Sequence, residues 1–468
     1  MKRLFIIFTF IIIFIVIFYS LYLLHVKKEQ IKTLQKEQNE KIEKILVDLQ
    51  KLEPQEFNMH EISNLKDIVN SSKYFKFEIN GNFETKLESY KKTNPFNLQE
   101  VKGLGFKNPK FPGHYKIKGK PGAYLETIDD YLILVNWDGR IYVSLNKIKE
   151  IISGQYEKIE FREIESNFQL HVNNLGFYKV NSQSVRDVYV KKNKIYLSFT
   201  NQDMDKEKRL NCFNIDILEG NFDILDEYIS FKNIFKPNQC HIPSEVGEDQ
   251  PSQSGGRIQM INNDIIVTFG DYRSRGYVQL DNDVIGKIFN TSKNKIISKG
   301  HRNPQGLYFD ESRNLLLSTE HGPQGGDEIN LIDVNLLNSK KYNFGWPISS
   351  YGVHYGNRKI EGSPLYKSHE DHGFDEPLKY FVPSIGISEI RKVGEYYYFG
   401  SMSSDERIKS GSRSISRFKL DENLKITNFK SYPLYERVRD IAVSNNRYLI
   451  LSLEVGSKIV FIDTEDLK

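Results

Sequence analysis

The sequence has only two cysteines among its 468 residues, Cys212 and Cys240. Their spacing matches no metal-binding pattern, which excludes a metal site built on cysteine. A single disulfide requires an oxidising compartment, whereas two unpaired thiols do not. Both alternatives remain open at this point.

The chain also lacks a strong excess of charge of either sign. Its 65 Lys and Arg residues nearly balance its 61 Asp and Glu residues, which leaves a formal net charge of +4. Such a balance implies no broad basic face, so we expect no nucleic-acid partner. Hydrophobic residues make up 39% of the chain and aromatic residues 13%, so it is able to bury a large core.

Helical periodicity is nearly absent beyond Asn108, apart from short stretches such as Asn146 to Ile152. A different unit recurs there: an apolar run of roughly alternating character, a polar turn and a second apolar run. The six copies cover 125–144, 185–200, 257–271, 306–322, 387–402 and 438–456. Irregularly spaced strand-turn-strand units predict an all-β fold, a six-bladed β-propeller, because a β-sandwich would space them more evenly.

The N-terminal segment differs from the rest of the chain because it is continuously apolar. Residues Leu4 to Leu24 form 21 successive residues without a charge, and as a helix they would span about 31 Å. The run is too long for the apolar core of a cleavable signal peptide, and no small-x-small site follows it. We therefore predict an N-terminal transmembrane helix that acts as an uncleaved signal anchor within residues 1–26.

Three further regions follow the anchor. Residues 27–53 are rich in Lys, Glu and Gln and predict a short helical spacer, for which a coiled coil is the less favoured alternative. Residues 54–108 are polar and predict a connecting segment, and residues 109–468 form the propeller. Six lysines follow the span while only Lys2 and Arg3 precede it, so a count of basic residues would place the propeller in the cytoplasm.

Residues able to perform chemistry are concentrated in three loops between His301 and Pro347. The loops read His-Arg-Asn-Pro-Gln-Gly at 301–306, Glu-His-Gly-Pro-Gln-Gly-Gly-Asp-Glu-Ile-Asn at 320–330 and Asn-Phe-Gly-Trp-Pro at 343–347. They bring together an arginine, amides, carboxylates and a histidine. This composition is typical of a ligand site placed on a β scaffold.

In this order and spacing, the three motifs resemble those of the soluble quinoprotein glucose dehydrogenases and aldose sugar dehydrogenases, the glucose/sorbosone dehydrogenase family. Weaker matches extend from about Val185 to the C-terminus. The resemblance implies a six-bladed propeller that oxidises a sugar with pyrroloquinoline quinone (PQQ) and Ca2+. It also implies a periplasmic or extracytoplasmic propeller, against the count of basic residues.

In that family a histidine accepts the proton of the sugar's anomeric hydroxyl, and an arginine stabilises the developing oxyanion. Asp271 matches the acidic neighbour of the histidine, and Arg302 matches the arginine. The positions that match the residues around the quinone are Arg302, Asn303, Gln305, Arg437 and Arg439. The positions that match Ca2+ sites are Gly322 and Pro323 at the cofactor and Glu328 and the Phe344 carbonyl at a structural ion.

Three positions depart from the family pattern. Gln253 stands at the place of the catalytic histidine, Ser403 at that of a lysine that pairs with the quinone's carboxylates, and Ser182 at that of a glutamine. Glutamine has no accessible pKa with which to act as a base. Two hypotheses follow: a PQQ-dependent aldose dehydrogenase, or a catalytically impaired propeller that binds a glycan or an envelope partner through the same face.

Other residues near the loops have less specific expectations. We expect His321 to form structural hydrogen bonds, and Phe344 and Trp346 to pack within their turn. His241 offers a substitute base together with an acidic stretch, although a solvated loop is the preferred interpretation there. The acidic residues of that stretch are Glu245, Glu248 and Asp249.

Overall fold

The computed structural model describes most of the chain beyond residue 122. The described ranges are 123–153, 158–172, 184–204, 210–242, 252–323, 325–352, 368–403, 413–434, 436–454 and 458–467, with the backbone of two earlier strands at 74–80 and 98–102. The predicted anchor Leu4 to Leu24 and the predicted spacer helix lie outside these residues. Within the described ranges, no helix is both long and apolar enough to cross a membrane.

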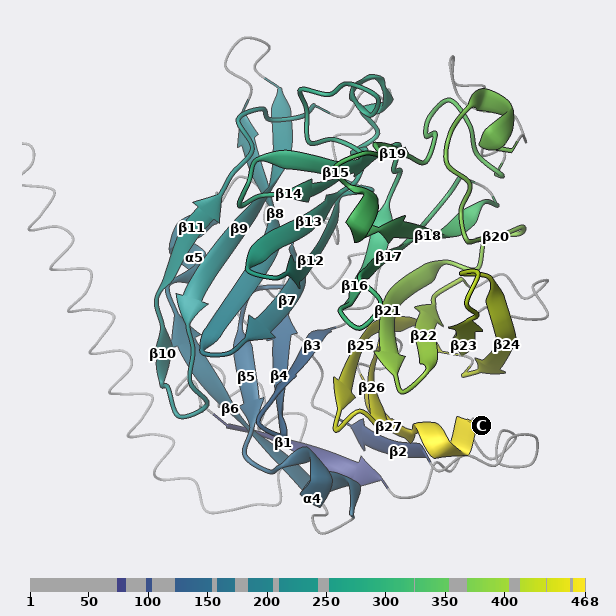
Figure 1. Ribbon diagram of the computed structural model, residues 1–468. Coiled ribbons are helices and arrows are strands. Elements are labelled where there is room, and N and C mark those ends of the chain that lie inside the picture. The colour runs from purple at the N-terminus through teal and green to yellow at the C-terminus, as the bar shows by residue number, and fades with distance from the viewer. Residues whose placement is uncertain are drawn as a thin grey trace, which may run out of the picture. The chain divides into compact units, whose positions relative to one another are not determined.

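Six mainly antiparallel blades follow one another along the chain (Figure 1), and the first and the sixth belong to one continuous sheet. The first blade contains β3 (Ala123–Ile128), β4 (Tyr131–Asn136), β5 (Ile141–Ser144) and β6 (Lys158–Ser166). The second contains β7 (Val185–Lys191), β8 (Lys194–Met204), β9 (Asn211–Asn221) and β11 (Phe231–Phe235). The third contains β12 (Gly255–Ile261), β13 (Asp264–Phe269), β14 (Lys287–Asn290), β15 (Lys295–Lys299) and β19 (Tyr342–Asn343).

The fourth blade contains β16 (Pro304–Asp310), β17 (Leu315–Glu320), β18 (Asp327–Asp333) and β20 (Lys379–Phe381). The fifth contains β21 (Ile387–Val393), β22 (Tyr396–Ser401), β23 (Ser414–Leu420) and β24 (Ile426–Pro433). The sixth contains β25 (Val438–Ser444), β26 (Tyr448–Leu453), β27 (Lys458–Asp463) and β2 (Leu98–Lys102). Helical pieces are short, as in α4 (Ile148–Ile152) and α5 (Phe168–His171).

The last blade combines strands from the two ends of the described chain. Strand β2 pairs with β27, and β1 (Tyr74–Asn80) joins β2 to β6 of the first blade. Both early strands lie within 54–108, the region that the sequence assigns to a connecting segment. Their pairing closes the ring of blades, so that no edge remains between the first and the last.

The six repeated units of the sequence each supply the two inner strands of one blade. The innermost strands β3, β7, β12, β16, β21 and β25 are neighbours in this order, and β25 lies beside β3. Apolar clusters fill the space between every pair of consecutive blades, including the sixth and the first. The predicted all-β, six-bladed propeller is confirmed.

Five innermost strands share a local irregularity that aims side chains at the centre of the ring. Near their first residues β7, β12, β16, β21 and β25 each carry a register shift against their partner strand. Such bulges bend a strand and redirect its side chains. The third residues of these strands are Asp187, Arg257, Gly306, Glu389 and Asp440.

The two cysteines are joined. Cys212 on β9 and Cys240, after β11, form a disulfide, with their Cα atoms 5.2 Å apart. The disulfide links strand β9 of the second blade to the loop that follows β11. Of the two alternatives that the sequence allows for these cysteines, the structure has the disulfide.

Candidate functional site

The residues matched to the quinone site come together where the innermost strands begin. Gln253 precedes β12, Arg302 and Asn303 precede β16, and Arg437 and Arg439 flank the first residue of β25. They belong to three blades that are far apart in sequence. The hydrogen bonds described below join them into one network, here called the axial-face site.

Arg302 is the hub of this network. Its backbone N–H donates to Glu320 Oε2 at 2.7 Å, and its Nη1 donates to the carbonyls of His321, at 3.1 Å, and Gly322. The guanidinium lies 5.5 Å from the centre of the Trp346 ring. Its Nε is buried and has no hydrogen-bond partner among the described residues. Arg302 therefore retains a donor that a ligand is able to use.

Gln253, at the place of the family's histidine, bridges Arg302 and Asp271. With its amide nitrogen facing the carboxylate, it donates to Asp271 Oδ1 at 2.7 Å and accepts from Arg302 Nη2 at 2.9 Å. Burial raises the pKa of Asp271, against the opposing effect of Arg302. Trp346, expected only to pack, donates from Nε1 to Asp271 Oδ2 at 2.8 Å. Asp271 is thus a fully bonded carboxyl rather than one exposed to a ligand.

Two amides connect the fourth blade to the sixth. Gln305 Nε2 donates to Asn303 Oδ1 at 2.9 Å, and Gln305 Oε1 accepts from Arg439 Nη1 at 3.2 Å. Asn303 Nδ2 lies 3.4 Å from His321 Nδ1. His321 Nε2 lies 2.7 Å from the Ile387 carbonyl, to which it donates, so Nδ1 is the acceptor nitrogen. Because burial lowers the pKa of His321, the neutral ring is favoured.

A buried carboxylate, Glu454, holds the two late arginines. Arg437 Nε lies 2.5 Å from Glu454 Oε2, and Arg439 forms an ion pair with the other oxygen. Burial alone would raise the pKa of Glu454, but Arg439 and Arg437 lower it below its usual value. Arg437 also donates to the Met402 carbonyl, next to Ser403. The arginine pair is fixed in place and already partly neutralised.

The two carbonyls matched to the cofactor's Ca2+ both have donors in this structure. The Gly322 carbonyl accepts from Arg302, and the Pro323 carbonyl accepts from Ser384 Oγ at 3.2 Å. A guanidinium therefore stands where a cation would approach Gly322. In this arrangement the pair does not fit a Ca2+ ion, because a cation and the Arg302 guanidinium compete for the same carbonyl oxygen.

The residues matched to the structural Ca2+ site are better suited to binding a cation. Glu328 and Phe344 border a cavity of about 10 Å³, which is room for one water-sized atom, and Glu320 supplies a second carboxylate to its wall. Asn330 Oδ1 is buried nearby with no partner in the described part of the chain. Such an oxygen-rich donor set suits a hard cation.

His369 lies against this cavity and already binds Glu328. Its Nε2 is 2.9 Å from Glu328 Oε1, and its Nδ1 contacts Ser349. Burial lowers the pKa of His369, but Glu328, Glu376 and Glu320 together raise it by more, so the net shift is upward. A cation in the cavity would therefore share Glu328 with an imidazolium.

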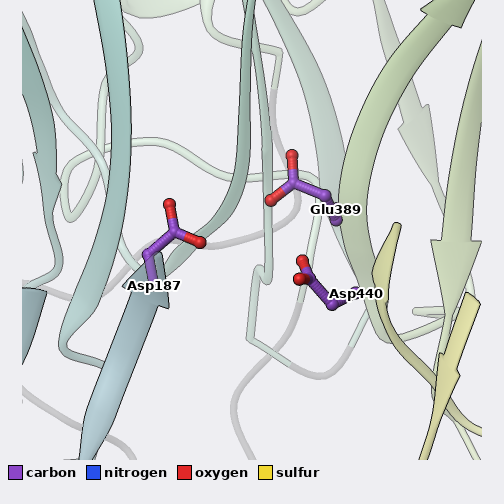
Figure 2. A group of neighbouring side chains, drawn as sticks. All are labelled: Asp187, Glu389 and Asp440. Carbon is purple, nitrogen blue, oxygen red and sulfur yellow. The ribbon is translucent and has the colours of Figure 1, made fainter. Parts of the chain in front are cut away.

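A second cluster of charges lies on the axis and touches the axial-face site. Figure 2 shows Asp187, Glu389 and Asp440 pointing toward one another from β7, β21 and β25; their oxygens lie within 4.8 Å of one another. Arg257 Nη1 contacts all three, at 2.9, 2.8 and 2.6 Å. A guanidinium thus occupies the position that a metal ion would need. We call these four residues the axis cluster.

Two more charged residues border the axis cluster. Arg391 forms ion pairs with Glu389 and, at 3.6 Å, with Glu126. Burial raises the pKa of Asp187 to about 8 and that of Glu126 to about 7, although nearby arginines oppose both shifts. Four carboxyls face two guanidinium groups here, so protons on some of the carboxyls bring the buried charges closer to balance.

His241, the possible substitute base, lies elsewhere. It is buried, 3.4 Å from Asp283, and stacks near Tyr272. Burial lowers its pKa, which the Asp283 carboxylate opposes. The acidic residues expected to accompany it, and Ser182, lie outside the described residues. Nothing within the described residues connects His241 to Arg302 by hydrogen bonds.

The sequence motifs did not identify Glu454, His369 or the axis cluster as parts of a site. Only the axis cluster is marked by a sequence pattern, because Asp187 and Asp440 occupy the same place in the repeats 185–200 and 438–456, each of which begins Val-Arg-Asp. Glu454 and His369 stand in no recognisable motif. Their roles depend on contacts between distant blades.

A comparison with protein families agrees with this fold. The sequence profile described as Glucose / Sorbosone dehydrogenase matches residues 180–460, which is more than half of the chain. The chain therefore belongs to the glucose/sorbosone dehydrogenase family.

Among curated relatives, the aldose sugar dehydrogenase of Escherichia coli is 28% identical over 171 residues, which is 35% of this chain and 42% of that protein. Quinoprotein glucose dehydrogenase B of Acinetobacter calcoaceticus is 30% identical over 276 residues, which is 50% of this chain and 53% of that protein. The matched segments thus span about half or less of the length of these relatives.

Solved structures share the fold. A glucose dehydrogenase aligns with a TM-score of 0.56 at 18% identity, covering 73% of this chain and 96% of that one. The soluble aldose sugar dehydrogenase of Escherichia coli in its apo-form aligns with a TM-score of 0.54 at 16% identity, with the same coverage. At these identities the likeness concerns the fold alone.

Proposed function

We propose that this chain is a PQQ-dependent dehydrogenase that oxidises an aldose. The observation that carries the proposal is the network of Arg302, Asn303, Gln305 and Arg439, which joins two blades at the positions matched to the family's quinone site. The buried, unpartnered Nε of Arg302 supports it, because an anionic ligand would satisfy that donor. The described residues suit a planar anion in charge and in hydrogen-bonding type.

Each residue has a physical task in this proposal. PQQ, when bound, supplies the acceptor for the hydride that leaves the sugar. Arg302 and Arg439 hold anionic groups with fixed guanidinium forks, while Asn303 and Gln305 orient the ligand through amide hydrogen bonds. By the resemblance to the family, Arg302 would also stabilise the negative charge that develops on the sugar oxygen.

The proton of the sugar hydroxyl needs an acceptor other than Gln253. We assign this role to His321 Nδ1, the acceptor nitrogen of an imidazole whose lowered pKa keeps the ring neutral. Replacing His321 with Asn keeps a polar side chain but removes the base. We expect turnover to fall by about 10²- to 10⁴-fold, with PQQ affinity changed far less.

In this proposal, a Ca2+ ion in the small cavity has a structural role. Glu320, Glu328 and the carbonyls around the small cavity would hold the ion and fix the loop that carries Gly322 and Pro323. No reaction step depends on it.

Gln253 favours a second function, that of a binding propeller without redox activity. Its neutral amide forms hydrogen bonds with both Asp271 and Arg302, and it stands at the position where the family has a base. In this case the same face would bind a glycan or an envelope partner. Tight binding of PQQ, measured by equilibrium titration, would contradict this alternative.

Dye reduction tests the two functions directly. Purified full-length protein with PQQ and Ca2+ is given a panel of aldoses, alongside Arg302→Ala and Gln253→His. The dehydrogenase proposal expects aldose-dependent reduction, its loss in Arg302→Ala and a gain in Gln253→His. No reduction by any variant across the panel would count against it.

The cellular location is also part of the proposal. We place the propeller on the periplasmic or extracytoplasmic side of a membrane, anchored through Leu4 to Leu24. The Cys212–Cys240 disulfide supports this side, because such bonds persist in oxidising compartments. Protease added to intact spheroplasts would digest an extracytoplasmic propeller and spare a cytoplasmic one.

A further inference from the structure

A large cavity in the described part of the chain lies on the outer part of the third blade, away from the axial-face site. Its volume is about 720 Å³, and its walls come from the end of β11, the loop before β14, the strand β15 and the loop before β19. We call it the lysine groove. None of the residues matched to the quinone or Ca2+ sites lines it.

The walls of the groove carry an excess of positive charge. Two acidic residues, Asp281 and Asp283, face five lysines, which are Lys236, Lys295, Lys299, Lys340 and Lys341. Three of the lysines are engaged: Lys236 lies 3.4 Å from Asp203, Lys299 2.7 Å from Asp281, and Lys340 2.6 Å from Asp375.

The other two lysines have no such partner. Lys295 and Lys341 are exposed and form no ion pair with any residue that the structure describes, although Lys341 adds at longer range to the effect of Lys299 in lowering the pKa of Asp281. Their charges are therefore available to an anionic ligand. The groove contains no arginine, so it offers point charges rather than planar forks for phosphate.

Amides accompany the lysines around the groove. The exposed amide side chains of the wall are Asn238, Gln239, Asn282, Asn294 and Asn338. Amides donate and accept hydrogen bonds, as sugar hydroxyls do. Asp283 adds a buried acceptor, since its Oδ2 has no hydrogen-bond partner within the described residues. A hydroxyl donor would satisfy this oxygen.

The groove offers little to nucleic acids or to apolar protein surfaces. Of its three aromatic residues, Phe289 and Tyr342 are only 6% and 5% exposed, and the partly buried Phe235 ring packs against Phe269 and Phe289, so the groove offers little surface for base stacking. None of the wall residues is an exposed large hydrophobic residue. Lysines interleaved with amides match a chain of sugars that bears carboxylates.

We propose that the lysine groove binds an anionic oligosaccharide, one whose sugar units carry carboxylate groups. The lysines pair with the carboxylates, and the amides and Asp283 bind the hydroxyls between them. This binding is separate from the proposed reaction at the axial face. It would hold the protein on a carboxylated glycan without occupying the axial-face site.

The test uses purified full-length protein in detergent and titrates it with oligogalacturonate. A neutral maltooligosaccharide of equal length, inorganic phosphate and a single-stranded DNA oligonucleotide are titrated in parallel. We expect oligogalacturonate to bind, its affinity to fall as salt rises, and the other three probes to bind at least about tenfold more weakly. Equal binding of phosphate or DNA would overturn the proposal, as would the absence of oligogalacturonate binding.

Charge reversal locates the site. We expect Lys295→Glu/Lys341→Glu to weaken oligogalacturonate binding at least about tenfold, because two charge-assisted contacts become repulsive. Lys149→Glu/Lys425→Glu changes the net charge equally at exposed positions outside the groove and is expected to bind as the wild type does. An equal loss in both double variants would contradict the proposed site. All four substitutions lie on the surface, and an unchanged unfolding temperature verifies that each variant is folded.

Discussion

The axis cluster and the axial-face site are built from the same residue types, yet they differ in how completely those residues are bonded. Arg257 contacts three carboxylates, and its Nε and Nη2 donate to the carbonyls of Gln305 and Arg439. Arg302 keeps a buried Nε without a partner in the described structure. An arginine whose donors are hydrogen-bonded within the protein stabilises the fold, whereas an arginine with an unsatisfied donor is suited to binding a ligand.

The two regions are directly connected. Arg257 donates from Nε to the Gln305 carbonyl at 2.7 Å, while the Gln305 side chain belongs to the axial-face site. The axis cluster thus positions the strands from which the site residues project. Changes in the cluster should act mainly on stability, and changes in the site mainly on binding.

The largest effect is expected from removing the central guanidinium. Arg257→Met removes the cation shared by Asp187, Glu389 and Asp440 and leaves only Arg391, which pairs with Glu389; breaking such a buried network costs about 3 to 5 kcal/mol. Denaturant unfolding of the full-length protein measures this loss. Arg302→Met is the matched control. An equal loss of unfolding free energy in both variants would contradict the proposed difference between the two regions.

Calcium tests the oxygen-lined cavity beside the site. If Ca2+ binds the folded chain alone, a concentration of one hundred times its dissociation constant stabilises the fold by about 2.7 kcal/mol. Thermal unfolding with Ca2+ and with a chelator shows the difference, and Glu328→Gln should reduce it strongly. An identical response in the variant would place the ion elsewhere.

Arg302 is expected to matter for binding more than for folding. Its removal deletes charge-assisted hydrogen bonds worth roughly 1.5 to 3 kcal/mol, so Arg302→Ala should weaken PQQ binding by about 10- to 100-fold. Arg302→Lys should restore little, because a lysine lacks the planar fork. Full recovery in Arg302→Lys would mean that charge alone is recognised.

The pH dependence of stability should reveal the axis cluster. Glu126 and Asp187 have raised pKa values, about 7 and about 8, in the folded protein. The folded state therefore holds protons that the unfolded state has released, and their stabilising effect is lost as the pH rises from about 4 to about 8. Glu126→Gln should flatten the lower part of this decline, between about pH 4.5 and 7. Parallel pH curves for both proteins would contradict these assignments.

The sequence was sufficient to predict the architecture, because each blade repeats a local strand-turn-strand pattern. The early strands β1 and β2 were not predicted, since they stand within the weakly patterned region 54–108 and acquire strand structure by pairing with β6 and β27. Their place depends on partners 80 or more residues away in the sequence rather than on periodicity.

The site was predictable only in part, for a related reason. Motifs identified Arg302, Asn303 and Gln305, which stand in one loop. Glu454 and His369 act through contacts that form only when blades meet, and no local pattern marks them. Trp346 resembled a packing residue, and its hydrogen bond to Asp271 joins two loops that are far apart in sequence.

We propose that the axial-face site binds PQQ. An equilibrium titration of PQQ into the purified full-length protein tests this binding. We predict saturable binding at one site, weakened by about 10- to 100-fold in Arg302→Ala and unchanged in the lysine-groove variant Lys295→Glu/Lys341→Glu. No binding to the wild-type protein, or unchanged binding in Arg302→Ala, would contradict it.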